Sequence, residues 1–402
     1  MPVAGERPEP FYEPTRGLAL WDSTEVDAAV EVLRSRSLFR YYGPELLHRT
    51  DEFERRFAEH LEVPHAIAVS SGTAAITTAL IGLGIPAGAE VIIPAVTFVG
   101  CVNAVVQARG IPVFADIDDT LTLDPTSVEE RITDRTFAIM PVHLANVAAD
   151  LDPLLEVARR RGVKVLEDAA QAAGVRYRGR RVGAIGDAGA FSFQLEKNIT
   201  AGEGGTVTAL DPEVADRARR YQDQGGQFTT SRGQERGGVA DAPFVGANLR
   251  MTELAAALLT VQLSRLDPML DRLRAVAAHV RSELADLGLT WRRMPDEAGS
   301  GGDLTLLTAG RMEARALVGA LAAESVPAGT LYQGQGVYAN PAVKAGRTPW
   351  GLEWPPPARL RASEQIAGRA VTVSLGAAMT DQDVDRLVAA IRKAHANSGT
   401  AR

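Results

Sequence analysis

Three short segments of this 402-residue chain carry side chains that could do chemistry together. The first is Ser70-Ser71-Gly72-Thr73, which lies between a short apolar run and a pattern typical of a helix. Free backbone N–H groups at a helix start, the helix dipole and hydroxyl donors together favour a bound anion. An ordinary helix cap made by Ser71 or Thr73 is the alternative interpretation.

The second segment is VLEDAAQ (165–171), in which Asp168 ends an apolar run. A carboxylate at that place lies at the carboxyl edge of a sheet, where open α/β sheets bind ligands. Burial of its charge is costly unless a cationic group pairs with it. Gln171 shares the face of Asp168 if a helical turn starts here, and a simple Asp helix cap is the alternative.

The third segment is FSFQLEKNITAGEGG (191–205), which contains Lys197, one of only four lysines in the chain. Apolar and cationic surroundings would lower the pKa of this amine and make it a nucleophile toward an aldehyde. The alternative is a solvated surface lysine. Ser192 precedes it by five residues and could donate to the same anion as the first segment.

A phosphate site, a buried acid and an amine are the three groups that pyridoxal 5′-phosphate (PLP) requires. Its phosphate suits a helix N-terminus, its aldehyde a lysine, and its ring nitrogen a carboxylate. Phe98, at the end of an apolar run in PAVTFVG, would stack on the ring. The sequence therefore predicts PLP as the cofactor, and it predicts no metal site.

The elements that must position these residues alternate between strand and helix. Short apolar runs separated by helical patterns indicate an α/β fold, with a mostly parallel sheet covered by helices on both faces. Seven strands are predicted, over residues 65–70, 90–95, 112–117, 137–142, 163–168, 188–193 and 205–210.

The rest of the chain predicts an arm and a second, smaller domain. We expect an N-terminal arm and helix over 1–50, a large cofactor-binding domain over 51–265, and a linking helix with a small C-terminal α/β domain over 266–402. A loop rich in Gly, Gln and Arg spans 222–246. The small domain has two strand-like runs and two amphipathic helices, over 304–309, 370–375, 312–323 and 381–394.

Composition limits the function classes. The chain is 46% hydrophobic and 23% charged, with net charge −7 and one cysteine, which is typical of a globular protein without disulfides. Neither a signal-peptide pattern nor a long unbroken apolar run is present, so we expect a cytoplasmic protein without a membrane partner. An acidic chain without a basic helix argues against nucleic acid as a partner, and so against a DNA-associated regulator.

Several motifs in order also carry a resemblance to a known family. They are SSGTAA (70–75), PAVTFV (94–99), DIDDTLTLDP (116–125), ITDRTFAIMPVH (132–143), EDAAQAAG (167–174), GDAGAFSFQLEKNITAGEGG (186–205) and GANLRMTELAAA (246–257). The chain resembles the DegT/DnrJ/EryC1/StrS sugar aminotransferases. This resemblance implies the fold-type-I PLP transferase architecture and a homodimer in which both subunits build each active site.

By position, the resemblance makes Lys197 the lysine that binds the cofactor aldehyde and moves the proton, and Asp168 the partner of the ring nitrogen. It implies further cofactor contacts from Gly72, Thr73, Phe98, Gln171 and Ser192, with Asn248 reaching in from the neighbouring subunit. Relatives that act as dehydratases carry histidine in place of the lysine, so Lys197 favours transamination.

The expected reaction moves an amino group from glutamate or glutamine to a ketone of a sugar, nucleotide-linked or free, or of a cyclitol. Antibiotic or other amino-sugar biosynthesis is the expected setting. The alternatives are another PLP reaction on the same fold (lyase, dehydratase or oxidative deaminase) and an acceptor of the aminohydroxybenzoate type.

One departure from the family lies in VHLAN (142–146), where Asn146 stands at a position that is glycine in many relatives. Asparagine tolerates a positive φ better than other non-glycine residues, so an altered turn is expected beside the site. Candidates for substrate contact, with ordinary packing as the alternative for each, are Arg40, Tyr41, Tyr42, His143, Tyr332 and Tyr338.

Overall fold

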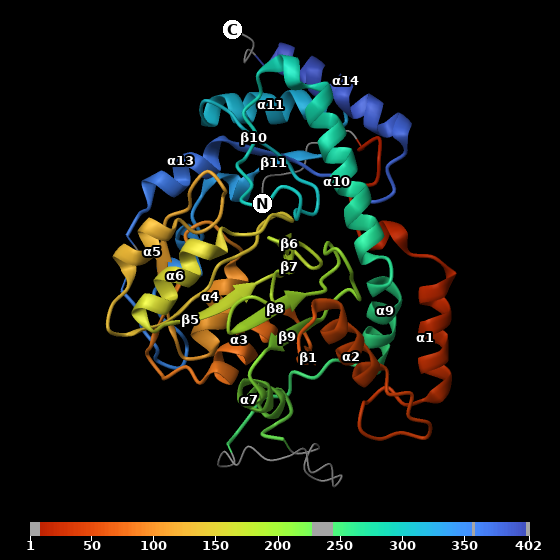
Figure 1. Ribbon diagram of the computed structural model, residues 1–402, viewed down its shortest axis with the longest axis vertical. Helices are drawn as coiled ribbons and strands as arrows, with labels where there is room; N and C mark the ends of the chain where they lie inside the picture. The colour runs from red at the N-terminus through yellow and green to blue at the C-terminus, as the bar shows by residue number, and fades with distance from the viewer. Residues whose placement is uncertain (1–8, 227–243, 356–357, 399–402) are drawn as a thin grey trace.

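The computed structural model describes residues 9–226, 244–355 and 358–398. A large seven-stranded sheet has helices on both faces, and a three-stranded sheet lies beyond one end of it (Figure 1). The predicted α/β class, with one large mostly parallel sheet and a smaller C-terminal unit, is confirmed. Most of the loop predicted over 222–246 lies outside the described residues.

The large sheet contains all seven predicted strands. Its spatial order is β1-β9-β8-β5-β4-β2-β3, and β9 runs antiparallel to both of its neighbours while the other pairs are parallel. The bounds are β1 (His65–Val69), β2 (Glu90–Pro94), β3 (Ile111–Ala115), β4 (Thr136–Ile139), β5 (Lys164–Asp168), β8 (Ala188–Ser192) and β9 (Gly205–Ala209).

Alternation along the strands builds two cores, one on each face of the sheet. In β1, Ile67 and Val69 join a core with α3 (Gly72–Leu83), α4 (Val99–Gln107) and α7 (Pro212–Gln222). Ala66 and Ala68 face the other way. Their core includes α2 (Arg49–Leu61), α6 (Leu151–Arg161), α9 (Glu253–Leu263) and α10 (Leu266–Glu283).

The small sheet has the order β10-β12-β11, with β10 (Leu304–Leu307), β11 (Ala328–Thr330) and β12 (Ala370–Val373). The two predicted helices are present as α11 (Arg311–Ala323) and α14 (Asp381–Asn397). Strand β11 and helix α13 (Arg361–Arg369) were not predicted. β11 is only three residues long, and α13 has no side-chain cap at its start, so neither leaves a strong pattern in the sequence.

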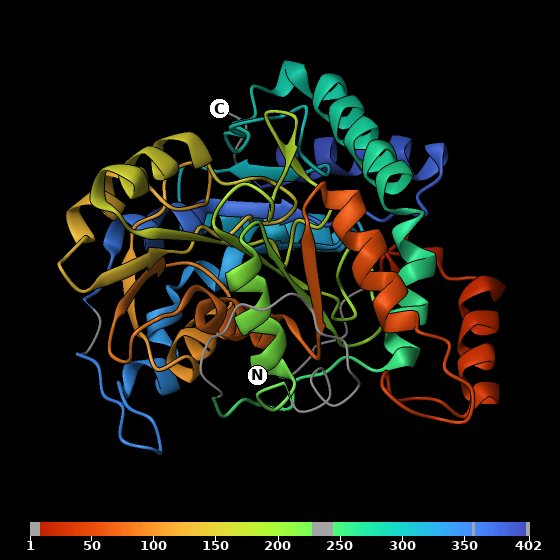
Figure 2. The same ribbon diagram turned by 60° about the horizontal axis from the view of Figure 1, so that its bottom comes forward.

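The N-terminal arm leads into α1 (Ser23–Ser35), which packs beside α9, and α2 packs on the same helix (Figure 2). In the described residues, the remaining elements are α5 (Pro125–Arg131), α12 (Pro341–Lys344), the hairpin β6–β7 (Arg176–Tyr177 and Arg180–Arg181) and four short 3-10 turns. Helix α10 runs along one side of the molecule from α9 to the small unit, where it packs against α14 (Figure 1), and the domain boundary expected at residue 265 stays a prediction. No helix in the described ranges combines the length and apolar character needed to cross a membrane.

Candidate active site

A cavity of about 510 Å³ lies where β1 and β5 end and where α3 and α4 begin. The three predicted segments meet there. Of the predicted cofactor contacts, Gly72, Thr73, Phe98, Asp168, Gln171, Ser192 and Lys197 all line it, and so does Tyr332.

The N-terminus of α3 opens on the cavity. Ser71 caps the helix, since its Oγ accepts a hydrogen bond from the Ala74 N–H at 3.1 Å. The N–H groups of Gly72 and Thr73 belong to the first turn, which has no intrahelical acceptors, and that turn carries no acidic side chain. The cap does not exclude the predicted anion site, because Ser71 caps the helix while the N–H groups of the next two residues remain available to an anion.

Gly72 is required by a close approach. A Cβ at this position would lie 2.6 Å from the Cβ of Ser192, nearer than real Cβ atoms come to one another. The absence of a side chain lets Ser192 of β8 approach the first turn of α3. Two donor groups from distant parts of the chain, the α3 amides and the Ser192 hydroxyl, thus lie at one end of the cavity.

Asp168 is the last residue of β5 and is only 3% exposed. One carboxylate oxygen accepts from the Ala170 N–H at 3.0 Å, and the other from the Cys101 Sγ at 3.0 Å. Cys101 also lies 3.1 Å from the Thr97 Oγ1. Burial raises the pKa of the Cys101 thiol, and the adjacent Asp168 charge raises it further, so the thiol stays protonated and donates. The carboxylate is therefore held in one orientation.

Lys197 lies in the loop between β8 and β9 and reaches the same cavity. Burial lowers its pKa from the usual lysine value, although the charge of Asp168 opposes this. The residue after it is anchored, because the Asn198 side chain donates to the Ala173 carbonyl at 2.9 Å and to the Asn146 Oδ1 at 2.8 Å. The lysine therefore projects from a fixed segment.

Asn146 adopts the positive φ that its place in the family pattern predicts, with φ at 62°. Its backbone N–H donates to the Gln171 carbonyl at 3.0 Å, and its buried side chain accepts from Asn198. It thereby links the segment after Asp168 to the segment after Lys197.

Phe98 and Tyr332 bring aromatic rings to the cavity. Phe98 stands at the start of α4 and is 59% exposed, which leaves a face of its ring open. The Tyr332 hydroxyl accepts from the Gln171 Nε2 at 3.1 Å, and burial raises the pKa of this phenol. Tyr332 belongs to the short turn η3 (Leu331–Gly334), which carries part of the small unit into the site.

The structure does not bring the other substrate candidates to this cavity within one chain. Arg40 is buried against Glu54, with an Nη1 to Oε1 distance of 3.0 Å, and also pairs with Asp51. Tyr41 and Tyr42 pack edge-on against Phe39.

His143 and Tyr338 also have packing roles in this chain. The fully buried His143 lies with its Nε2 3.0 Å from Glu167, and its Nδ1 accepts from the Ala149 N–H at 3.0 Å. Tyr338 is buried and donates to Glu364 at 3.0 Å. The exposed Asn248 lies outside the cavity of its own chain, so its contact with a neighbouring subunit stays a prediction.

Sequence reasoning missed two residues of the site, Thr97 and Cys101, which form a chain of contacts to Asp168. The one available signal was spacing, since Cys101 lies one helical turn after the aromatic Phe98. Acidic and amide side chains at the rim were also missed, namely Gln194, Glu196 and Glu203. Across the described ranges, no three His, Cys, Asp or Glu side chains gather as a metal site would need.

Comparison with known proteins gives a family match over most of the chain. The model described as "DegT/DnrJ/EryC1/StrS aminotransferase family" matches residues 21–392. A structure of DesV from S. venezuelae in complex with a ketimine intermediate is 35% identical, with a TM-score of 0.78 over 92% of this chain and 93% of that one.

Two curated relatives are more similar over shorter stretches. A GDP-perosamine synthase of Caulobacter vibrioides is 42% identical over 238 residues, which is 59% of this chain and 62% of the relative. An L-glutamine:2-deoxy-scyllo-inosose aminotransferase of Streptomyces kanamyceticus is 41% identical over 298 residues, 72% of this chain and 66% of the relative. The chain thus matches less than two thirds of the length of either relative.

Proposed function

This chain belongs to the DegT/DnrJ/EryC1/StrS aminotransferase family, and from that premise we propose that it is a PLP-dependent aminotransferase. It takes an amino group from glutamate or glutamine and passes it to a ketone on a sugar or a cyclitol. The names of the two curated relatives, one for a GDP-linked amino sugar and one for an inosose, support this pair of acceptor classes.

One observation carries the proposal. A lysine with a lowered pKa, a fixed carboxylate and an open helix N-terminus line a single cavity of about 510 Å³. Structural lysines and aspartates are common, but this combination matches the aldehyde, ring nitrogen and phosphate of PLP one by one.

The residues present fit this cofactor. The α3 amides of Gly72 and Thr73, with the Ser192 hydroxyl, would hold the phosphate in a cradle that a side chain at position 72 would fill. Asp168 would hold the proton on the ring nitrogen, Phe98 would stack on the ring, and Gln171 would lie near the ring hydroxyl. When bound, the cofactor accepts the amino group of one substrate, withdraws electrons from the carbon that carried it, and later gives the nitrogen to the second substrate.

Lys197 would carry the proton. Because burial favours its neutral amine, it can take the proton from the Cα of the amino donor, and as the protonated ammonium it can later give a proton to the acceptor carbon that gains the nitrogen. Asp168 stays fixed during these steps, since the Ala170 amide and the Cys101 thiol each hold one of its oxygens. Gln171 donates a hydrogen bond to the Tyr332 hydroxyl, so the two side chains form one part of the cavity wall.

The subunit arrangement and the location in the cell also remain proposals. We expect a homodimer in which Asn248 completes the phosphate site of the partner subunit, and we expect the protein in the cytoplasm.

Product analysis tests the proposed reaction against the other PLP reactions. Purified protein is mixed with PLP, glutamine or glutamate, and candidate keto-sugars and cyclitol ketones. The proposal predicts one oxo acid formed for each aminated product, with no free ammonia. Ammonia release without an aminated acceptor would indicate a lyase or an oxidative deaminase and would overturn it.

A further inference from the structure

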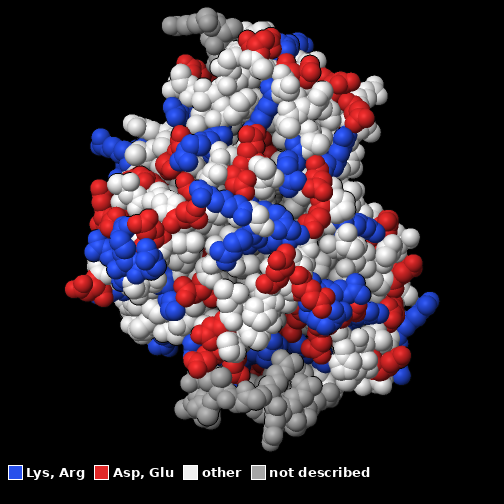
Figure 3. Space-filling view, viewed as in Figure 1, with Lys and Arg blue, Asp and Glu red and all other residues white. Residues whose placement is uncertain are grey.

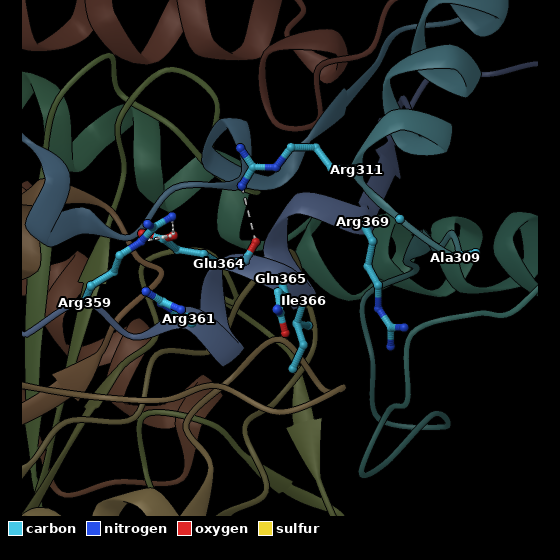
Figure 4. A pocket seen from close by; sticks show the side chains of 9 residues that line it. Ala309, Arg311, Arg359, Arg361, Glu364, Gln365, Ile366 and Arg369 are labelled. Atoms are coloured by element: carbon cyan, nitrogen blue, oxygen red, sulfur yellow. Dashed lines mark hydrogen bonds and ion pairs between the residues drawn. The ribbon is translucent and has the colours of Figure 1, made fainter.

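A second cavity lies on the small unit and is lined by four arginines. Its volume is about 790 Å³, and Arg311, Arg359, Arg361 and Arg369 surround it together with Glu364 and Gln365 (Figure 4). On the face of the molecule that Figure 3 shows, acidic and basic side chains are interspersed, and the whole chain carries a net charge of −7. A group of four arginines with one carboxylate is therefore a local exception.

The single carboxylate forms an ion pair with only one of these arginines. Glu364 binds Arg359 through Nε and Nη2, at 2.8 and 2.6 Å, and also accepts from the Tyr338 hydroxyl at 3.0 Å. Arg311 donates to two backbone carbonyls, those of Gly334 at 2.6 Å and Glu364 at 3.5 Å. No ion pair joins Arg311 to a carboxylate among the described residues, although its charge helps to lower the pKa of the nearby Glu364.

Arg361 and Arg369 make no side-chain hydrogen bond or ion pair with any part of the chain that the structure describes. The Nε of Arg369 is buried without a partner, which is costly unless a ligand supplies an acceptor. Three of the four guanidinium groups thus make no ion pair with the described residues, and the one carboxylate of the cavity leaves it with an excess of positive charge.

Helix α13 sets the spacing of the unpaired arginines. Arg361, Gln365 and Arg369 recur every four residues, so they lie along one face of α13. With a rise of 1.5 Å per residue, the two arginines are about 12 Å apart along the axis. An anion with two or more charged groups fits this spacing better than a single phosphate does.

The guanidinium group of Arg311 lies against two glycines, Gly368 and Gly334, and a side chain at either position would displace it. A Cβ on Gly368 would lie 2.9 Å from the Arg311 Nε, and a Cβ on Gly334 would lie 3.0 Å from its Nη2. The start of α11 opens on the same cavity through Gly310 and Arg311, and no side chain caps it. First-turn amides and guanidinium forks both suit phosphate oxygens.

We propose that this arginine cavity is a binding site for a diphosphate-type anion, such as inorganic pyrophosphate or the diphosphate of a nucleotide. The turn η3 connects it to the candidate active site, because Tyr332 lines the one and the Gly334 carbonyl binds Arg311 of the other. The anion therefore belongs either to the acceptor itself or to a separate phosphorylated metabolite. The binding stands independently of the proposed aminotransferase reaction, whereas assignment to the acceptor rests on it.

Calorimetric titration of the PLP-loaded protein with inorganic pyrophosphate at about 0.1 M salt tests the site. Loading with PLP fills the phosphate end of the active-site cavity, so that end does not bind the added pyrophosphate. We expect saturable binding to the wild type, weakened at least tenfold in the double variant Arg361→Gln with Arg369→Gln. The matched control is Arg34→Gln with Arg159→Gln, which removes two exposed arginines outside the cavity and should bind as the wild type does.

Failure to bind pyrophosphate saturably, or an equal loss in the control pair, would overturn the proposal. Circular dichroism melting of both double variants shows that each remains folded. The source of the anion follows from kinetics. If the acceptor carries it, pyrophosphate competes with a nucleotide-linked acceptor, and the Arg361/Arg369 variant raises the acceptor KM at unchanged kcat. If a separate metabolite carries it, the acceptor KM is unchanged while binding is still lost. Absence of any amino transfer would contradict the proposed function and leave the binding result intact.

Discussion

Substitution of Gly72 by alanine tests the phosphate end of the candidate active site. The residue is the first of α3, where alanine is compatible with the helical backbone, so the change adds one methyl group without backbone strain. That methyl carbon would lie 2.6 Å from the Cβ, 3.0 Å from the Oγ and 3.3 Å from the Cα of Ser192. The neighbour is mostly the base of a side chain in β8, which cannot rotate away.

The size of the effect follows from this overlap. Insertion of a methyl group into a packed site typically costs about 1–3 kcal/mol. In the cofactor-free protein, Ser192 can shift and release part of that strain. In the cofactor-bound protein, the Ser192 hydroxyl must stay beside the phosphate, so the strain mainly weakens the free energy of PLP binding. Since about 1.4 kcal/mol corresponds to a factor of ten, we expect PLP to bind roughly tenfold or more weakly.

Titration of the cofactor-free protein with PLP, followed by absorbance or tryptophan fluorescence, measures this dissociation constant. The matched control is Gly319→Ala in α11, where a Cβ meets nothing within 4 Å. It should bind PLP as the wild type does and gain slightly in stability, since alanine favours a helix over glycine. Equal PLP affinity of Gly72→Ala and Gly319→Ala would refute the placement of the phosphate between α3 and Ser192.

Three further predictions follow from the charged groups. Asp168→Asn keeps the shape of the side chain but removes its charge. A pair of charges about 4 Å apart in a partly buried site is worth about 4 kcal/mol, so the rate of turnover with the amino donor, measured by stopped flow, should fall by about 10³. Near-normal turnover would contradict the pairing of Asp168 with the ring nitrogen. Burial lowers the pKa of Lys197 below the usual 10.5, so the rate at which PLP recombines with the cofactor-free protein should rise with pH at a midpoint below that value, and a midpoint at or above 10.5 would contradict the buried amine. Burial alone would raise the pKa of Glu54, but Arg40 and Arg219 lower it to about 2. The contribution of this carboxylate to the free energy of unfolding is therefore present above the unfolded-state pKa near 4.5 and is lost as pH falls toward 2, about 3 kcal/mol in all. Urea unfolding at a series of pH values should show this loss in the wild type and not in Glu54→Gln. The same dependence of unfolding free energy on pH in both proteins would contradict the prediction.

The sequence predicts the large sheet well because its strands are buried on both faces. The run VII in β2 follows the charged Glu90, and the run AGAF in β8 ends at the polar Ser192, so short apolar stretches beside polar residues mark both strands. The ends of β1 and β5, and with them the helix start at Gly72 and the carboxylate Asp168, follow from the same pattern. The small unit is predicted less completely, since β11 is short and α13 has no cap.

Tertiary contacts explain most of what the sequence could not give. The thiol of Cys101 meets Asp168 because the start of α4 lies beside the end of β5, and the spacing of Cys101 after Phe98 does not by itself reveal that neighbour. Arg40 was a candidate for contact with an anionic substrate, but it forms ion pairs with Glu54 and Asp51 of α2. His143 follows a strand end, but its ring turns toward the buried Glu167. In each case the residue type shows which interactions the side chain can make, and its neighbours in the fold determine which of them it makes.

Reduction with borohydride tests the central claim most directly. Protein loaded with PLP is treated with sodium borohydride, digested, and analysed by mass spectrometry. The account predicts a pyridoxyl group on the peptide that contains Lys197, and no such group in Lys197→Ala. A label on Lys164, Lys344 or Lys393 with none on Lys197, or no label at all, would contradict it.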